Sequence, residues 1–197
     1  QGLSSVAIGN LAGYTNQGQS SVAFGSTSGQ SSQGSSAVAI GNSAGNTGQG
    51  GGAIAIGQAA GNNSQGLQSV AIGNLAGYTN QGQSSVAIGP TCGVNSQGAN
   101  AVAIGNSAGN TGQGGGAIAI GQSAGSNSQG INSIAIGNLA SQNSSVANSI
   151  CLNASGVALN PGQAGLFVRP IRGVALGIGV NRLSYDPVNF EIVYSTT

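Results

Sequence analysis

Apolar residues recur along this chain with a period of sixteen residues, and each occurrence has the same short form. The segment reads Val/Ile-Ala-Ile-Gly in nine consecutive copies, with Phe24 replacing one isoleucine. Its closing glycines are Gly9, Gly25, Gly41, Gly57, Gly73, Gly89, Gly105, Gly121 and Gly137. A tenth, degenerate copy ends at Asn153, so the repeats fill residues 1–160. A fixed period of this length is typical of solenoid proteins, in which each repeat is one structural unit.

The pattern within a repeat predicts strands rather than helices. Nothing recurs at 3.6 residues, and each repeat contains at least two glycines, which disfavour a helix. We therefore predict an all-β fold, a parallel β-solenoid with two short strands per sixteen-residue coil and about 4.8 Å between coils. Ten such coils would form a rod roughly 48 Å long.

The same pattern predicts which side chains fill the coil. On a strand, the Val/Ile column and the Ile column share one face, so we expect them to point inward. The alanine column between them would then point outward. Because this column never changes to Ser, Thr or Asn, we expect sister chains to cover it, and we predict a homotrimer. The predicted subunit interface is Ala7, Ala23, Ala39, Ala55, Ala71, Ala87, Ala103, Ala119, Ala135 and Cys151.

A second invariant column consists of glutamines, each followed by a glycine. Stacked coils would place their amides one above another, and we expect each side chain to bond its neighbours in a ladder. The predicted ladder residues are Gln17, Gln33, Gln49, Gln65, Gln81, Gln97, Gln113 and Gln129.

Composition excludes several functions. The 197 residues include three arginines, two acidic residues and no histidine, and no charged side chain precedes Arg169. Nucleophiles in that long region have no side chain to activate them, so we expect no enzymatic activity, no metal site and no cofactor. A net charge of +1 offers no basic surface to nucleic acid. No window is apolar enough for a membrane span, and the start at Gln1 suggests a fragment of a longer protein.

Two cysteines replace alanines in their columns. Cys92 and Cys151 lie almost four coils apart, roughly 17 Å by the stacking distance. A disulfide requires Cα atoms within about 7 Å. We predict two buried free thiols.

Residues 161–197 differ from the repeats, since they contain all five charged side chains. The stretch RLSYDPVNFEIVYSTT predicts a β-hairpin, with strands near 183–185 and 190–194 and a turn at DPVN. A solenoid needs a cap, because its last coil otherwise exposes a core and strand edges. We therefore divide the chain into a solenoid at 1–160 and a capping and trimerisation segment at 161–197.

Two resemblances extend this interpretation. The repeated SVAIGN motif resembles the heads of bacterial trimeric autotransporter adhesins, which are trimeric parallel β-rolls, over residues 1–160. The segments NSICLNASGVALNPGQAGLFVRPIRGV and LSYDPVNFEIVYST resemble the region that closes the shaft of trimeric fibre proteins in large DNA viruses. With its repeats, the chain is similar to the cell-wall attachment proteins of chloroviruses, which infect algae. These resemblances imply a homotrimeric, extracellular protein on the virion surface that holds host cell-wall carbohydrate, with no catalytic residues.

The columns that vary between coils mark the expected binding surface. Amides and hydroxyls suit sugar hydroxyls, and an exposed tyrosine offers a flat apolar face. Tyr14 and Tyr78 are four coils apart, about 19 Å, and three chains would multiply weak sites into avidity. The candidate glycan-binding residues are Asn10, Tyr14, Thr15, Asn46, Asn74, Tyr78, Thr79 and Asn110.

Other functions fit the same sequence. The chain would serve as a passive shaft if its tyrosines only cover loop backbone, or as an adhesin head of the bacterial type. An ice-binding solenoid is a further alternative, because Thr15, Thr47, Thr79 and Thr111 share one column. The column is not made of threonine alone, because it also contains Ser31, Asn63 and Asn95.

Overall fold

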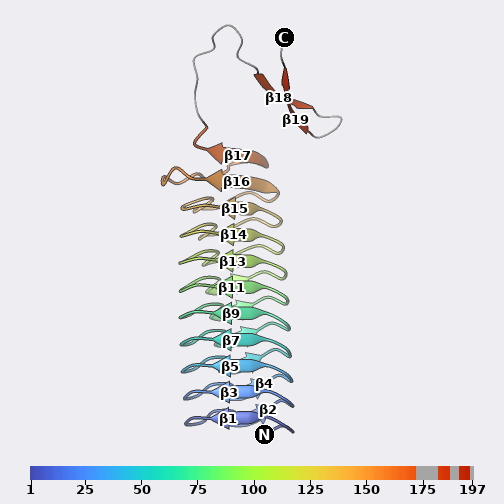
Figure 1. The fold of residues 1–197 in the computed structure, drawn as a ribbon, viewed down its shortest axis with the longest axis vertical. Helices are drawn as coiled ribbons and strands as arrows, with labels where there is room; N and C mark the ends of the chain where they lie inside the picture. Colours follow the sequence, from blue (N-terminus) through green and yellow to red (C-terminus); the bar gives the residue numbers. More distant parts are fainter. Residues whose placement is uncertain (172–181, 187–190, 196–197) are drawn as a thin grey trace.

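The computed structural model describes residues 1–171, 182–186 and 191–195. Residues 1–160 form a parallel β-solenoid with one coil per sixteen residues, which confirms the predicted architecture. One strand of each coil stacks on that of the next in a single column from β1 to β17, with turns stacked on either side (Figure 1).

The larger sheet, sheet A, contains eleven parallel strands. Neighbouring strands pair at a constant offset of sixteen residues, so Ala7 lies opposite Ala23 and Ala119 lies opposite Ala135. Its strands are β1 (Val6–Ile8), β3 (Val22–Phe24), β5 (Val38–Ile40), β7 (Ile54–Ile56), β9 (Val70–Ile72), β11 (Val86–Ile88), β13 (Val102–Ile104), β14 (Ile118–Ile120), β15 (Ile134–Ile136), β16 (Ser149–Asn153) and β17 (Gly165–Arg169).

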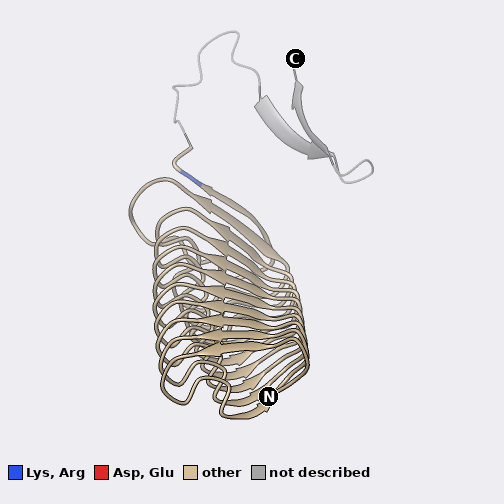
Figure 2. Ribbon diagram, turned by 60° about the horizontal axis from the view of Figure 1, so that its bottom comes forward, with Lys and Arg blue, Asp and Glu red and all other residues tan. Residues whose placement is uncertain are grey.

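The second sheet, sheet B, lies on the other side of the flattened coils (Figure 2). Its six strands are β2 (Thr15–Gln17), β4 (Ser31–Gln33), β6 (Thr47–Gln49), β8 (Asn63–Gln65), β10 (Thr79–Gln81) and β12 (Asn95–Gln97). Isolated parallel bridges continue it from Asn95 through Thr111 and Asn127 to Asn143. Two short strands per coil therefore follow the prediction.

Glycine is required directly after each sheet A strand, where the chain turns out of the sheet. Gly73 has a φ of 131°, and a Cβ atom added there would lie 2.6 Å from the carbonyl oxygen of Gly89 in the next coil. No side chain fits at that separation, and L-residues rarely adopt that φ. The closing glycines therefore permit the tight stacking of successive coils.

The predicted direction of the side chains in sheet A was wrong. Every member of the alanine column from Ala23 to Cys151 is fully buried inside the single chain, and Ala7 in the first coil is half-buried. The Val and Ile columns instead face outward, with Ile8 54% exposed and Phe24 52% exposed. The alanines therefore do not form a surface that sister chains could cover, and the predicted subunit interface is incorrect.

The reason is the thinness of the coil. The interior holds only side chains the size of a methyl, hydroxymethyl or thiol group, together with the glutamines. These small side chains come from three columns of the repeat, which include Ala37, Ala39 and Ala44. In the nine regular repeats, each of the three columns contains only Ala, Ser or Cys. Valine and isoleucine are too large for this space, so strand alternation sends them outward.

The glutamine column is buried, but the predicted ladder forms at only two steps. Each of these amides donates from Nε2 to a backbone carbonyl in sheet A, eleven residues earlier, at 2.8–2.9 Å. Direct amide–amide bonds join Gln33 to Gln49 and Gln113 to Gln129, both at 3.1 Å. The glutamines therefore connect the two sheets of a coil more than they connect successive coils.

Sheet A continues beyond the predicted end of the repeats at residue 160. Ile150 lies opposite Leu166 and Cys151 lies opposite Phe167, so β17 keeps the sixteen-residue offset. The coil pattern changes between these strands, where Asn153 replaces the usual glycine. Its Nδ2 atom donates to the carbonyl oxygens of Asn138 and Val157, both at 2.8 Å.

The two strands of the predicted C-terminal hairpin pair with each other. β18 (Arg182–Asp186) and β19 (Glu191–Ser195) are antiparallel, with Leu183 opposite Tyr194. The rest of the predicted turn, after Asp186, lies outside the described residues.

Candidate binding surfaces

The rod presents an apolar face formed by the outward side chains of sheet A. It runs from β1 to β17 without interruption and precedes the first charged residue, Arg169. Its members exposed by more than a third are Val6, Ile8, Phe24, Ile40, Ile88, Ile120, Ile136, Ile150, Leu152, Leu166 and Val168. A continuous exposed apolar surface of this kind marks a site of association.

The opposite side of the rod is a polar face formed by the first residue of each sheet B strand and its later equivalents. Its column is Thr15, Ser31, Thr47, Asn63, Thr79, Asn95, Thr111, Asn127 and Asn143. Some members bond along the column: Thr15 Oγ1 donates to Ser31 Oγ at 3.3 Å, and Asn127 Nδ2 donates to Asn143 Oδ1 at 2.9 Å. The face offers hydroxyl and amide groups without charge.

Six of the eight predicted glycan-binding residues form two equivalent groups. Counting coils of sixteen residues from residue 1, one group lies in coil one (1–16) and the other in coil five (65–80). Tyr14 is 67% exposed and directly precedes Thr15 on the polar face, with Asn10 exposed in the preceding turn. The second group contains Asn74, Tyr78 and Thr79, with Asn74 exposed and the other two half-buried. Asn74 also donates to Gln58 Oε1 at 3.3 Å.

The other two predicted residues, Asn46 and Asn110, hold the turns of the coil. Asn46 Nδ2 donates to the carbonyl oxygen of Thr27 at 2.9 Å, and its Oδ1 accepts from Thr47 Oγ1, also at 2.9 Å. Asn110 makes the equivalent bonds with the Thr91 carbonyl and the Thr111 hydroxyl, at 2.7 and 3.0 Å. Both amides therefore have structural partners on each side and little capacity left for a sugar.

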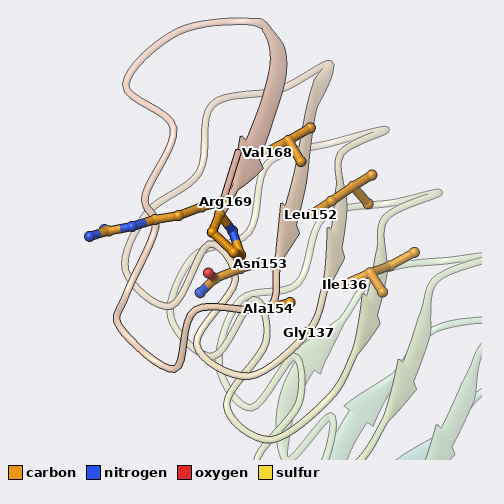
Figure 3. Close-up of a pocket in the computed structure, with 8 residues that line it drawn as sticks. Ile136, Gly137, Leu152, Asn153, Ala154, Val168 and Arg169 are labelled. Carbon is orange, nitrogen blue, oxygen red and sulfur yellow. The ribbon is translucent and has the colours of Figure 1, made fainter. Parts of the chain in front are cut away.

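A cavity of about 370 Å³ lies at the C-terminal end of the apolar face. Ile136, Leu152 and Val168 stand in a row along one side of it, and Arg169 points away from them (Figure 3). The remaining lining residues are Gly137, Asn153, Ala154 and Pro170. Sequence reasoning missed this cavity because it assigned the isoleucine column to the interior.

Both cysteines are buried and free, which confirms that prediction. Cys92 Sγ donates to the carbonyl oxygen of Gly89 at 3.0 Å, and Cys151 Sγ donates to that of Leu159 at 3.2 Å. Burial raises the pKa of Cys92 to about 12. Its thiol therefore stays protonated at neutral pH and is a poor nucleophile.

In the described part of the chain, no three His, Cys, Asp or Glu side chains gather, and no helix there is long and apolar enough to cross a membrane. The chain matches no protein-family model, no curated protein and no solved structure. Its function must therefore be inferred from the two faces of the rod.

Proposed function

We propose that this chain is the shaft of a homotrimeric fibre on a virion surface, and that it attaches to host cell-wall polysaccharide through its polar face. The observation that carries the proposal is the division of the rod into an apolar face and an uncharged polar face. The resemblance of the repeats and of the C-terminal segments to trimeric adhesins and viral fibres supports it.

The apolar face supports the trimer. Covering the exposed third to half of an isoleucine side chain contributes about 0.5–1.5 kcal/mol, and the face offers side chains exposed to this extent in most coils. A threefold axis parallel to the rod would bring three apolar faces together and leave no copy with an open face. This interface replaces the alanine column, which is occupied within each chain.

The polar face and its neighbouring turn support the attachment. Tyr14 is 67% exposed and Tyr78 is half-buried, and each directly precedes a threonine of the polar face, Thr15 or Thr79. An aromatic ring beside a hydroxyl suits the apolar and hydroxylated sides of a sugar ring. The two groups are four coils apart, about 19 Å. Trimerisation would give six such groups on one fibre, so weak individual contacts would yield avidity.

The antiparallel pair β18 and β19 has a place in the same proposal. A cap over the last coil would protect its strand edge and complete the fibre at this end. The resemblance of this segment to the closing region of viral fibre shafts supports that role.

A passive shaft is the second candidate function. The amides of Asn46 and Asn110 favour it, because both bond the turns of their own chain instead of remaining available at the surface. In that case the polar columns would only keep the rod soluble, and another part of the fibre would bind the host.

The attachment is tested with the purified chain, in a pull-down with insoluble cell-wall polysaccharide and on a glycan array. We expect binding, and we expect Tyr14→Ala with Tyr78→Ala to weaken it at least tenfold, since both groups are lost. Tyr14→Phe with Tyr78→Phe is the matched control, because it keeps the ring faces and should retain most of the binding. Intact chain that retains no polysaccharide in either assay would favour the passive shaft.

A further inference from the structure

Two edges border the apolar face, and large apolar residues occur on both edges in the same coils. The leading edge is the turn before each sheet A strand and contains Leu3, Leu67 and Ile131, which are 79%, 54% and 58% exposed. The trailing edge is the turn after each strand and contains Leu11, Leu75 and Leu139. These six residues belong to coils one, five and nine.

In each of the other coils, the leading-edge residue also resembles the trailing-edge residue in size and polarity. Polar residues stand on both edges of some coils, and small residues stand on both edges of others. The leading-edge and trailing-edge pairs are Gln19 and Thr27, Ser35 and Ser43, Gly51 and Ala59, Gln83 and Thr91, Ala99 and Ser107, and Gly115 and Ser123. Side-chain size and polarity therefore vary together on two edges that lie on opposite sides of the strands (Figure 1).

The trailing-edge leucines stand in strained turns of the single chain. Leu11, Leu75 and Leu139 have φ values of 55°, 58° and 59°, a left-handed conformation that is unfavourable for a bulky residue. Leu11 is also 42% exposed, and Leu75 and Leu139 are half-buried. A strained and partly exposed leucine at a turn suggests a contact outside the chain.

The edges are placed to meet in an assembly of this chain. Leu67 and Leu75 each stand four residues from Ala71, at the two borders of the apolar face. Any rotation axis parallel to the rod that brings apolar faces together also brings the leading edge of one copy to the trailing edge of the next. Such an axis involves no shift along the rod, so coils of equal number face each other.

The geometry points to three apolar rungs between neighbouring copies: Leu3 with Leu11, Leu67 with Leu75, and Ile131 with Leu139 of the next copy. This inference rests on the proposed homo-oligomer and adds its register. The rungs are about 19 Å apart along the rod. They lock the copies against sliding.

Such a lock is needed because the apolar face itself repeats in every coil. A slip of one coil would place Val-Ala-Ile strands on nearly identical strands and would lose the contacts of one coil only. The face alone therefore specifies register weakly. A slip of one, two or three coils would bring each leucine of the rungs against Gln, Ser, Thr, Gly or Ala, which disfavours the misaligned assemblies.

Disulfide trapping tests the rungs. In a background with Cys92→Ala and Cys151→Ala, the pair Leu67→Cys with Leu75→Cys should cross-link neighbouring copies under mild oxidation. Because each copy would bond both neighbours, a non-reducing gel should show a closed trimer that reductant dissolves. Sedimentation of the untreated protein establishes beforehand whether it is an oligomer.

Three controls make the result specific. Leu67→Cys alone and Leu75→Cys alone should not cross-link, because each edge meets the other edge and not itself. Leu67→Cys with Ser107→Cys is two coils out of register, an offset of about 10 Å against a Cα limit of about 7 Å. An oligomer that cross-links through a single variant or through the displaced pair, or not at all, would overturn the rungs and leave the fibre intact. A monomer in sedimentation would overturn both.

Discussion

The side-chain amide of Gln81 spans the coil and donates from Nε2 to the carbonyl oxygen of Val70 at 2.8 Å. Val70 lies in sheet A and Gln81 lies in sheet B, so the bond connects the two sheets across an interior that otherwise holds very small side chains. Gln81 is only 2% exposed, and its Oε1 atom has no hydrogen-bond partner within the described residues. One good hydrogen bond per coil therefore sets the thickness of the solenoid.

Replacing this glutamine should destabilise the rod. Gln81→Ala removes this bond between the two sheets and opens a cavity in the interior, which together cost about 2–3 kcal/mol. Urea unfolding followed by far-UV circular dichroism measures the loss. Gln83→Ala is the control, since Gln83 lies two residues further on and is exposed, and it should change the free energy of unfolding by less than about 0.5 kcal/mol. Equal stability of the two variants would contradict the bridging role.

Two glycines, one packed against the next coil and one with space for a side chain, test the stacking of coils. Gly73→Ala should be severely destabilising, by about 3 kcal/mol or more, because its new methyl group meets the Gly89 carbonyl and its φ is positive. Gly51→Ala should be tolerated or slightly stabilising, because the nearest atoms are at ordinary contact distances of 3.6 and 3.7 Å. Melting temperatures of the two variants provide the comparison. A tolerated Gly73→Ala would show that successive coils can move apart.

The buried thiol of Cys92 predicts a dependence of stability on alkaline pH. Its pKa is raised to about 12 by burial, so the folded chain holds the proton more tightly than the unfolded chain. The associated stability is fully present below about pH 8.5, the pKa of an exposed thiol, and is lost as the pH rises toward 12. Cys92→Ala should remove this part of the decline.

The measurement for Cys92 is urea unfolding at a series of pH values from neutral to strongly alkaline. Iodoacetamide labelling at pH 8 adds an independent readout: folded chain should label slowly and urea-unfolded chain quickly. Identical alkaline profiles for wild type and Cys92→Ala would show that the thiol ionises normally in the folded chain.

The period and the strand segments were accessible from sequence because they depend on the backbone path. Sixteen residues per coil, parallel pairing in register and a sharp turn at each closing glycine all follow from columns that never shift. The side-chain direction was not accessible from the strand alone. A three-residue strand such as Val86–Ile88 alternates equally well with alanine inside or outside.

A signal for the correct direction was present elsewhere in the repeat. The columns of Ala37 and Ala44 are also restricted to Ala, Ser and Cys, like that of Ala39, and three small columns in one coil are explained by a thin interior. For the candidate sites, the positions of Tyr14 and Tyr78 followed from the repeat. The use of the Asn46 amide did not, because its partner depends on how the turn of the preceding coil folds.

The apolar face predicts the behaviour of variants that change only its outward side chains. Ile88→Ser, Ile120→Ser and Ile136→Ser together remove three outward isoleucines from the face of sheet A, where each is 36–40% exposed in the single chain. We expect wild-type chain to sediment as a trimer and the triple variant to sediment as a monomer with an unchanged β-type circular dichroism spectrum, because the lost burial is intermolecular. Asn95→Ser, Asn127→Ser and Asn143→Ser alter the polar face in the same three coils and should leave the trimer intact. If the isoleucine variant stays trimeric, or the polar variant dissociates, the copies associate through a different surface of the rod.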